Sequence, residues 1–283
     1  MDEKRKTMPH HQVLIGVDGS LVAVRALDRA AEEAVRRGAE LRIVCAVADL
    51  AEAEPVLASA ASRVRARHPR LPMVLKGVEG GAVKVLARES WTAVLTVVGT
   101  RGFGAVSGLL AGSVSWRLTA SVRGPLLVVR GAHPEGQGGS VLLGLEDQAD
   151  APAARFAFQE AARRGARLRI LHVPIHRHTT PELPPLLATT SAGQARQVRT
   201  EPTEAAVPQF GTAQLREQFP GVEVDCQTVR TRPADALLSG SRDADVVVIG
   251  MRRRSRRLGP QIGSVGHALL QHAHCPVVLV PTT

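Results

Sequence analysis

The residues best suited to chemistry lie in one glycine-rich segment, residues 97–116, VVGTRGFGAVSGLLAGSVSW. Glycines stand at positions 99, 102, 104, 108 and 112, and glycine loses more backbone freedom on folding than any other residue. Such a density favours a place where the backbone must approach something closely. Gly112 and Ser113 are predicted to open a helix, whose free N–H groups, dipole and hydroxyl would attract an anion. Ser115 adds a second hydroxyl in the first turn, so the segment suits a phosphorylated ligand.

Two widespread nucleotide-binding motifs fit this segment poorly. A Walker A loop requires Gly-Lys-Ser/Thr, and the segment contains no lysine. GFGAVS, from Gly102, resembles part of a dinucleotide fingerprint, but it lacks the third glycine and follows the fourth expected strand instead of the first. A P-loop NTPase and a Rossmann dehydrogenase are therefore disfavoured. A structural alternative stays open, in which the glycines only permit tight packing of a helix on a strand.

The sequence repeats itself, and the repeat supplies the elements that position these residues. Four segments recur in the same order, which indicates two copies of one domain. We place the copies at residues 1–132 and 138–283, joined by a turn-rich linker. The matched pairs are VLIG and VLLG, AAEEAVRRGAELRIVCAV and FQEAARRGARLRILHVP, AVLTVVG and DVVVIG, and GSVSWRLTASVRGPLLVVR and GSVGHALLQHAHCPVVLVP.

Each copy alternates apolar strands with helices. Helices are predicted at about 21–37 and 152–164, each ended by a glycine, Gly38 or Gly165. Near-continuous apolar strands between helices predict an α/β domain, with a parallel sheet covered on both faces. Ligands of such sheets bind beyond the carboxyl ends of the strands, where the winding reverses. The glycine-rich segment begins there, directly after the fourth strand.

The overall charge is strongly basic, with 36 Lys and Arg against 26 Asp and Glu. Arginine dominates, in a composition rich in Ala, Gly and Pro that a G+C-rich genome produces without functional cause. Attraction to nucleic acid or phosphate is the functional alternative. The run MRRRSRR, residues 251–257, has no interleaved aromatic side chain for base stacking. We therefore interpret it as a solvated loop and expect no nucleic-acid partner.

The cysteines and histidines do not form a metal or disulfide pattern. The three cysteines are far apart without a CxxC pair, and Cys45 and Cys275 lie in apolar runs typical of buried positions. His272 and His274 are two residues apart at a helix end, a poor arrangement for a shared metal. The N-terminus lacks the apolar core of a signal peptide, and no apolar run is long enough to span a membrane. We expect a cytoplasmic protein without a protein-bound metal or a membrane partner.

Candidate catalytic acids are also weak. Glu32, Glu33 and Glu89 lie on helices rich in arginine, which we interpret as solvated faces. No Ser-His-Asp triad or pair of catalytic carboxylates can be placed. The sequence predicts binding chemistry, and we expect that the protein is not an enzyme.

Taken together, the motifs resemble the universal stress protein family. The resemblance is carried by Gly99-x2-Gly102-x9-Gly112-Ser113, by VLIGVDGS in the first strand, and by the final strands GPLLVV and CPVVLV. It covers nearly the whole chain as a tandem pair. It implies two tandem domains, each a five-stranded parallel sheet of order 3-2-1-4-5 with helices on both faces. It also implies pairing through the last strand and, in many members, ATP binding without strong hydrolysis.

The resemblance assigns a complete nucleotide site to the first copy. Asp18 matches the carboxylate that meets the adenine or ribose, and Gly16 permits close approach there. The backbone near Ala46 and Val47 matches the position that reads the adenine edge. The loop around the ribose and inner phosphates would comprise Gly99, Thr100, Arg101 and Gly102, and the outer phosphate cradle Gly112, Ser113 and Val114, with Ser115 adjacent.

The second copy matches the same pattern with two departures. Glu146 replaces the aspartate of the first strand, and Arg253 replaces the second glycine of the loop. The Arg253 side chain either obstructs the phosphate position or serves as a phosphate clamp. We predict a degenerate nucleotide site here. Its residues would be Gly144, Glu146, Gly250, Arg253, Gly263, Ser264 and Val265.

The sequence thus predicts an ATP-binding regulatory protein of the stress response, with Mg²⁺ neutralising the phosphates. The two copies are expected to pair within the chain around a pseudo-twofold axis, because their final strands would otherwise expose apolar edges. Such chains are then expected to form homodimers; no protein partner can be named. Two rival functions stay open: a nucleotide-independent interaction scaffold, and an ATP-using transferase that lacks an identifiable base or nucleophile.

Overall fold

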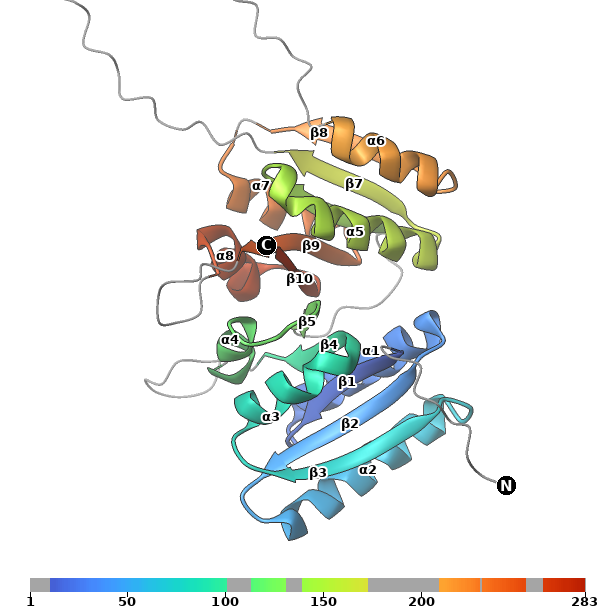
Figure 1. Ribbon diagram of the computed structural model, residues 1–283, viewed down its shortest axis with the longest axis vertical. Coiled ribbons are helices and arrows are strands. Elements are labelled where there is room, and N and C mark those ends of the chain that lie inside the picture. Colours follow the sequence, from blue (N-terminus) through green and yellow to red (C-terminus); the bar gives the residue numbers. More distant parts are fainter. Residues whose placement is uncertain are drawn as a thin grey trace, which may run out of the picture.

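The computed structural model describes residues 11–100, 113–130, 139–172, 209–229, 231–252 and 262–282. These residues form a ten-stranded sheet of order β3-β2-β1-β4-β5-β10-β9-β6-β7-β8 (Figure 1). Within each half all the strand pairs are parallel, and each half has the order 3-2-1-4-5. The α/β fold with two tandem five-stranded units is confirmed.

In the first half, called domain 1, strands and helices alternate along the sequence. Its elements are β1 (Gln12–Val17), α1 (Leu21–Arg37), β2 (Glu40–Val47), a 3₁₀ turn (Leu50–Glu52), α2 (Ala53–Arg67), β3 (Met73–Glu79), α3 (Ala82–Glu89), a 3₁₀ turn (Ser90–Thr92), β4 (Ala93–Gly99), α4 (Ser113–Thr119) and β5 (Leu126–Val129).

The second half, domain 2, repeats this order. Its elements are β6 (Ser140–Leu145), a 3₁₀ turn (Gln148–Asp150), α5 (Ala151–Arg164), β7 (Arg167–His172), α6 (Gln209–Gln218), β8 (Val224–Thr228), α7 (Pro233–Gly240), β9 (Val246–Arg252), α8 (Ser264–His272) and β10 (Val277–Thr282). The linker from 131 to 138 and the segment from 253 to 261 lie outside the described residues.

Local sequence explains where the long helices begin and end. The Ser20 side chain caps α1 by accepting a hydrogen bond from the Ala23 amide, and Gly38 ends the helix with a φ of 57°. Gly165 ends α5 with a φ of 59°. Glycine adopts this left-handed conformation without steric cost, and both predicted helix ends are confirmed.

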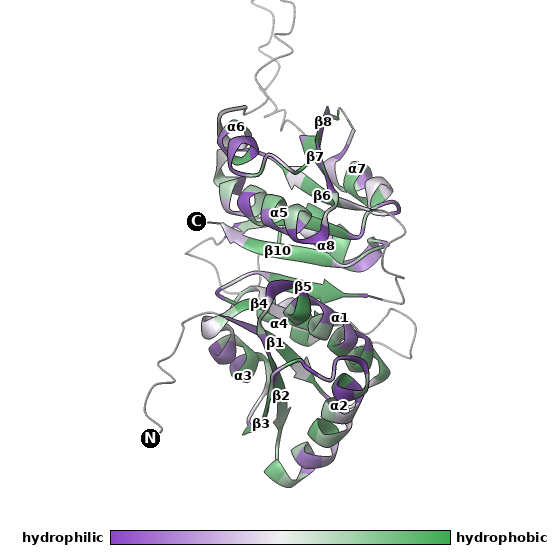
Figure 2. Ribbon diagram, turned by 90° about the vertical axis from the view of Figure 1, so that its right-hand side faces the viewer, coloured by the Kyte–Doolittle hydropathy of each residue, from purple (hydrophilic) through white to green (hydrophobic). Residues whose placement is uncertain are grey.

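The apolar residues form two layers of core, one on each face of the sheet. Because strand side chains alternate, Val13 and Ile15 of β1 belong to one layer with α1, α2, α5 and α6, and Leu14 belongs to the other with α3, α4, α7 and α8. The central strands are predominantly hydrophobic, as Figure 2 shows. Cys45 and Cys275 are buried as expected, and burial raises the pKa of Cys275 to about 12.

The two domains join through their last strands. β5 and β10 pair antiparallel, and Leu127 lies opposite Val278. These residues hold equivalent positions in the two copies, so a pseudo-twofold axis passes between them. The predicted internal pairing of the copies, and the covering of both apolar edges, are present in the structure.

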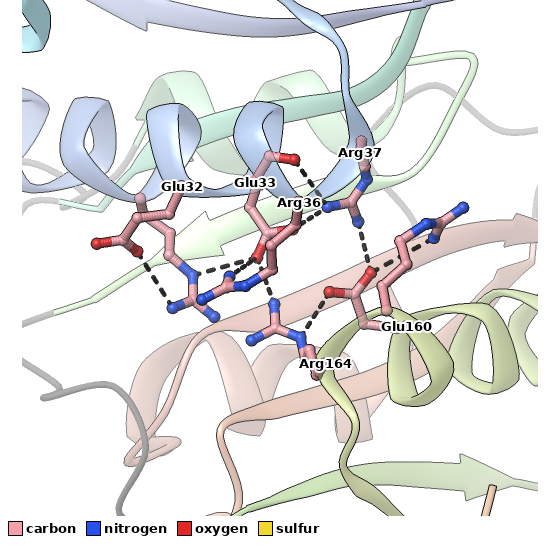
Figure 3. A network of polar contacts seen from close by, with 8 residues as sticks. Glu32, Glu33, Arg36, Arg37, Glu160 and Arg164 are labelled. Atoms are coloured by element: carbon pink, nitrogen blue, oxygen red, sulfur yellow. Dashed lines mark hydrogen bonds and ion pairs between the residues drawn. The ribbon is translucent and has the colours of Figure 1, made fainter. Parts of the chain in front are cut away.

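Helices flank this strand pair on both faces of the sheet. On one face the ring of Trp116 in α4 meets the ring of His267 in α8 edge-to-face, with centroids 5.0 Å apart. On the other face α1 and α5 contribute the interdomain ion cluster, shown in Figure 3. The cluster comprises Arg29, Glu32, Glu33, Arg36, Arg37, Glu160, Arg163 and Arg164.

Two bonds of this cluster cross from one domain to the other. Arg37 contacts Glu160 at 2.5 Å, and Arg164 contacts Glu33. Both glutamates are only 1% exposed. Burial alone would raise the pKa of Glu33, but the charges of Arg37, Arg164 and neighbouring arginines outweigh it and lower the pKa to about 2.

The prediction that Glu33 and Glu89 lie on solvated faces is wrong. Glu33 is enclosed in the interdomain ion cluster, and Glu89 is 7% exposed, with bonds to Arg42 at 3.2 Å and Lys76 at 2.9 Å. The arginine-rich sequence around them provides their buried partners. Glu33 joins α1 to α5, and Glu89 joins α3 to β2 and β3.

Candidate functional site

A cavity of about 640 Å³ opens in domain 2 beyond the carboxyl ends of β6, β7 and β9. It lies where the strand order reverses between β6 and β9, the place where open parallel sheets bind ligands. One wall is formed by α7 and another by the start of α8. The lining includes Gly144, Leu145, Glu146, Asp150, Leu171, Pro233, Leu237, Ile249, Gly250, Met251, Arg252, Ile262, Gly263, Ser264, Val265 and Gly266.

Most residues that the sequence assigned to a second-copy site line this one cavity. Arg253 lies outside the described residues, so its predicted obstruction or clamping stays a prediction. The fold unites the others because parallel strands bring their carboxyl ends to one edge, where α8 begins. The residues brought together are Gly144, Glu146, Gly250, Gly263, Ser264 and Val265.

The three cavity glycines that the sequence assigned to the site have different roles. A Cβ on Gly144 would meet Leu237 at 3.0 Å, and one on Gly250 would overlap the Asp150 carboxylate. These two glycines therefore serve tight packing. A Cβ on Gly263 would meet no atom within 4 Å, so this position faces open space at the N-cap of α8.

A buried carboxylate supports the edge of the cavity, and the sequence did not predict it. Asp150 is 5% exposed, and its Oδ2 accepts hydrogen bonds from the backbone amides of Glu146 at 2.8 Å and Asp147 at 3.4 Å. It thereby fixes the turn that follows β6. The signal in the sequence was an aspartate before Ala-Pro at a helix start, which predicts a cap. Its side chain makes no capping bond to α5 and binds this turn instead.

Charged side chains meet at the mouth of the cavity. Arg252, the last residue of β9, donates to Asp147 Oδ2 and lies 3.6 Å from Glu146 Oε2. Burial raises the pKa of Glu146 above its ordinary value, the charge of Arg252 opposes this rise, and Asp150 and Asp147 add to it. The hydrogen bond to Asp147 raises the pKa of Arg252, which keeps the guanidinium charged. This cation is available to an anionic ligand.

The corresponding region of domain 1 is described only in part. Arg101, Gly102, Gly112 and the side chain of Ser113 lie outside the described residues. Asp18 is exposed at the end of β1, and its Oδ1 accepts hydrogen bonds from the Ser20 amide at 3.0 Å and the Ser20 hydroxyl at 2.5 Å. It thus orients the side chain that caps α1.

Packing accounts for the strand-end glycines of domain 1. A Cβ on Gly16 would meet Leu86 of α3 at 2.7 Å, and one on Gly99 would meet Val22 of α1 at the same distance. Gly99 is still within β4. For both residues the structure supports close packing of a helix on a strand, the alternative to ligand approach.

The other described residues of the predicted domain 1 site bond to the sheet or pack on it. The Val47 carbonyl accepts from Gly80 at 2.9 Å, beside Ala46 at the end of β2, and the Thr100 amide donates to Val129. Ser115 is 4% exposed, and its hydroxyl donates to the Gly99 carbonyl at 2.8 Å. This hydroxyl therefore ties α4 to β4. Val114, its neighbour, packs against the core.

The duplication, the sheet order and the cavity at the strand ends define a tandem α/β protein. The sequence model of the universal stress protein family matches residues 9–130 and 139–281. The chain belongs to this family.

Known relatives agree over the whole length. A universal stress protein of Mycolicibacterium smegmatis is 30% identical over 292 residues, covering 95% of this chain and 96% of the relative. Universal stress protein Rv2623 of Mycobacterium tuberculosis is also 30% identical, with 94% and 95% covered. A solved universal stress protein structure from Archaeoglobus fulgidus DSM 4304 has a TM-score of 0.62, 14% identity and coverage of 96% and 98%, which shows the shared fold.

Two further observations concern the residues that the structure describes. No helix among them is long and apolar enough to cross a membrane. Within the same ranges, no three His, Cys, Asp or Glu side chains are grouped so that they could hold a metal ion.

Proposed function

We propose that this universal stress protein is a cytoplasmic ATP-binding regulator and that the domain 2 cavity is one of its nucleotide sites. The observation that carries the proposal is the 640 Å³ cavity itself, placed between two strand ends and the start of α8. Ligand cavities typically measure about 300–1,000 Å³, so a nucleotide fits this volume. ATP would act as a ligand that shifts conformation or assembly, and not as a substrate of strong hydrolysis.

The lining offers complementary surfaces to the parts of a nucleotide. Leu171, Leu237 and Ile249 provide an apolar wall that suits a purine ring. The N-terminus of α8 with Ser264 offers backbone N–H groups, a hydroxyl and the positive end of the helix dipole to the phosphates. Arg252 adds a charged donor that binds phosphate oxygens strongly.

Mg²⁺ fits this site only as a companion of the phosphates. It prefers oxygen ligands and is commonly held by one or two carboxylates together with a nucleotide. Glu146 lines the cavity and could supply one such carboxylate, whereas Asp150 Oδ2 already accepts from two backbone amides. When bound, the ion would neutralise phosphate charge.

The proposal extends to domain 1 and to assembly. The domain 1 motif matches the family pattern without departure, so we propose a nucleotide site there as well. We further propose that the chain forms homodimers, which sedimentation velocity would test. A species with the mass of two chains supports this assembly, and a single species of 30.1 kDa at all concentrations contradicts it.

Gly263→Asp tests the domain 2 site. Aspartate is a favoured N-cap residue and the position has open space, so the fold should survive. Its carboxylate would stand where phosphate is proposed, so the variant should lose the domain 2 share of ATP binding measured by calorimetry. Gly221→Asp is the matched control, since that exposed glycine of domain 2 also has no neighbour within 4 Å of an added Cβ. Unchanged ATP stoichiometry and affinity in folded Gly263→Asp would contradict the proposal.

Nucleotide binding also distinguishes the proposed function from the rival scaffold function. A scaffold would keep its partner and show no nucleotide binding in either domain. ATP that copurifies with the parent chain, detected by mass spectrometry of released small molecules, supports the nucleotide function. Conversion of that ATP to a chemically distinct product would favour a transferase instead.

A further inference from the structure

The salt bridge at the mouth of the domain 2 cavity joins a residue that lines the cavity to one that does not. Arg252 is part of the lining, whereas Asp147 lies in the turn behind Glu146. The two side chains are 42% and 51% exposed, so water reaches both. An exposed ion pair of this kind is weak and can be exchanged for another partner.

The aspartate is held in place independently of the arginine. Its Oδ1 accepts a hydrogen bond from the Ala149 amide at 2.8 Å, and its own amide donates to Asp150. Its Oδ2 is thereby directed at the guanidinium of Arg252. The long arginine side chain is the flexible member of the pair, because it can swing while Asp147 stays fixed.

We propose that Asp147 competes with the phosphate groups of the ligand for Arg252, so that this salt bridge sets how strongly the cavity prefers phosphorylated ligands. The inference rests on the proposed nucleotide function of the cavity. A phosphate group offers the guanidinium two oxygens and more negative charge than one carboxylate oxygen. Arg252 therefore leaves Asp147 for a ligand with phosphates and stays with Asp147 for one without.

The competing carboxylate has no counterpart at the same position of domain 1. In the aligned first strands, Gly19 of domain 1 stands at the position of Asp147, and Asp18 at that of Glu146. Domain 1 thus has no side chain to hold an arginine at this point of the turn. The carboxylate is an addition of the second copy, placed where it adjusts the strength of phosphate binding.

Asp147→Asn tests this role with little risk to the fold. The amide oxygen of asparagine can still accept from Ala149, while the charge that holds Arg252 is lost. We expect ATP to bind the domain 2 cavity about two- to fivefold more tightly, the range of an exposed ion pair, and adenosine to bind unchanged. Binding is measured by calorimetry, with the domain 2 share defined by its loss in Gly263→Asp.

Two further variants make the result specific. Glu223→Gln removes a comparable exposed carboxylate of the same domain, paired with Arg167 at 3.2 Å, and should leave ATP affinity as in the parent. In an Arg252→Gln background, Asp147→Asn should have no effect, because no guanidinium is left to compete for.

The possible outcomes distinguish failure of the competition between Asp147 and phosphate from failure of the proposed nucleotide site. A gain in ATP affinity that persists without Arg252 would show general repulsion and overturn the competition, as would an equal gain for adenosine or no gain at all. If the parent and Gly263→Asp bind ATP alike, the proposed site itself fails. Tightening that requires Arg252 and phosphate supports the inference.

Discussion

Equivalent residues of the two domains form the ion pairs that cross between them, but different residues occupy equivalent places at the strand ends. Arg37 binds Glu160 across the interface, and its counterpart Arg164 binds Glu33. At the strand ends, a Cβ on Gly99 would meet Val22 of α1, whereas a Cβ on Gly250 would meet Asp150. The side chain that packs against the strand-end glycine is thus apolar in domain 1 and a buried carboxylate in domain 2.

This difference reflects two kinds of constraint. Each ion pair that crosses between the domains joins buried partners, so the loss of either glutamate or arginine would leave a buried charge unpaired. A ligand site is under no such constraint once the copies share one chain. The ion pairs therefore retain the symmetry of the duplication, and the residues around the cavities have diverged.

The largest expected effect comes from breaking the interdomain ion cluster. Glu33→Gln leaves Arg37, Arg164 and Arg29 without their shared buried carboxylate, which should lower the free energy of unfolding by about 3–5 kcal/mol. Glu160→Gln should cost less, because Phe156 of domain 2 stands at the position of Arg29. Urea unfolding measures both.

The exposed pair of Glu223 and Arg167 provides the control for this comparison. Glu223→Gln should change the free energy of unfolding by less than about 1 kcal/mol. Equal and small losses in all three variants would mean that the cluster does not hold the domains together.

The acid dependence of stability should report the same carboxylate. Its folded pKa of about 2 lies below the ordinary value of 4.5, so Glu33 stabilises the fold above pH 4.5. This contribution is lost as the pH falls from 4.5 toward 2. The difference in unfolding free energy between the parent and Glu33→Gln should therefore shrink across that window. A constant difference would contradict the lowered pKa.

The sequence could predict the helices and the sheet because their determinants are local. Gly38 marks a helix end by its own conformational freedom, and α1 spans the predicted residues. The burial of Glu33 could not be predicted in this way, because its partner Arg164 is 131 residues away. An arginine-rich helix face has the same pattern whether it meets water or a second helix.

The cavity shows the same limit. Its glycines and α8 follow from the repeated motif, but Asp150 acquires its role only when the turn after β6 folds back over it. Similarly, the Ser115 hydroxyl could be assigned to a phosphate from spacing alone. The structure brings it to the Gly99 carbonyl, because α4 packs against β4.

Replacing Asp150 with the valine found at this place in domain 1 tests whether the carboxylate is needed for the domain 2 turn. Asp150→Val installs the domain 1 residue and leaves the amides of Glu146 and Asp147 without their acceptor. We expect a loss of about 1–3 kcal/mol in unfolding free energy and faster amide hydrogen exchange at both residues. Unchanged exchange would mean that this carboxylate does not fix the turn.

Ser115→Ala should have a smaller effect, confined to domain 1. It removes the bond from the hydroxyl to the Gly99 carbonyl, at an expected cost of about 1 kcal/mol in thermal or urea unfolding. The equivalent residue of domain 2 is Gly266, which has no hydroxyl. ATP affinity in domain 1 should stay within twofold of the parent, since the hydroxyl faces β4. A large loss of ATP affinity without a loss of stability would indicate that Ser115 contacts the phosphates, as the sequence predicted.

The smallest effect is expected for the ring contact between the domains, where unlike residues face each other near the pseudo-twofold axis. Trp116 and His267 hold equivalent positions and meet edge-to-face at 87°, so a contact that would join like residues in a symmetric dimer joins unlike ones here. A double-mutant cycle with Trp116→Leu and His267→Ala should give a coupling of about 0.5 kcal/mol, because His267 is exposed. Since α8 begins at the proposed phosphate site, ATP should increase this coupling if binding fixes that helix. A coupling of zero both with and without ATP would show that the two helices pack independently and that the interface depends on β5, β10 and the ion cluster alone.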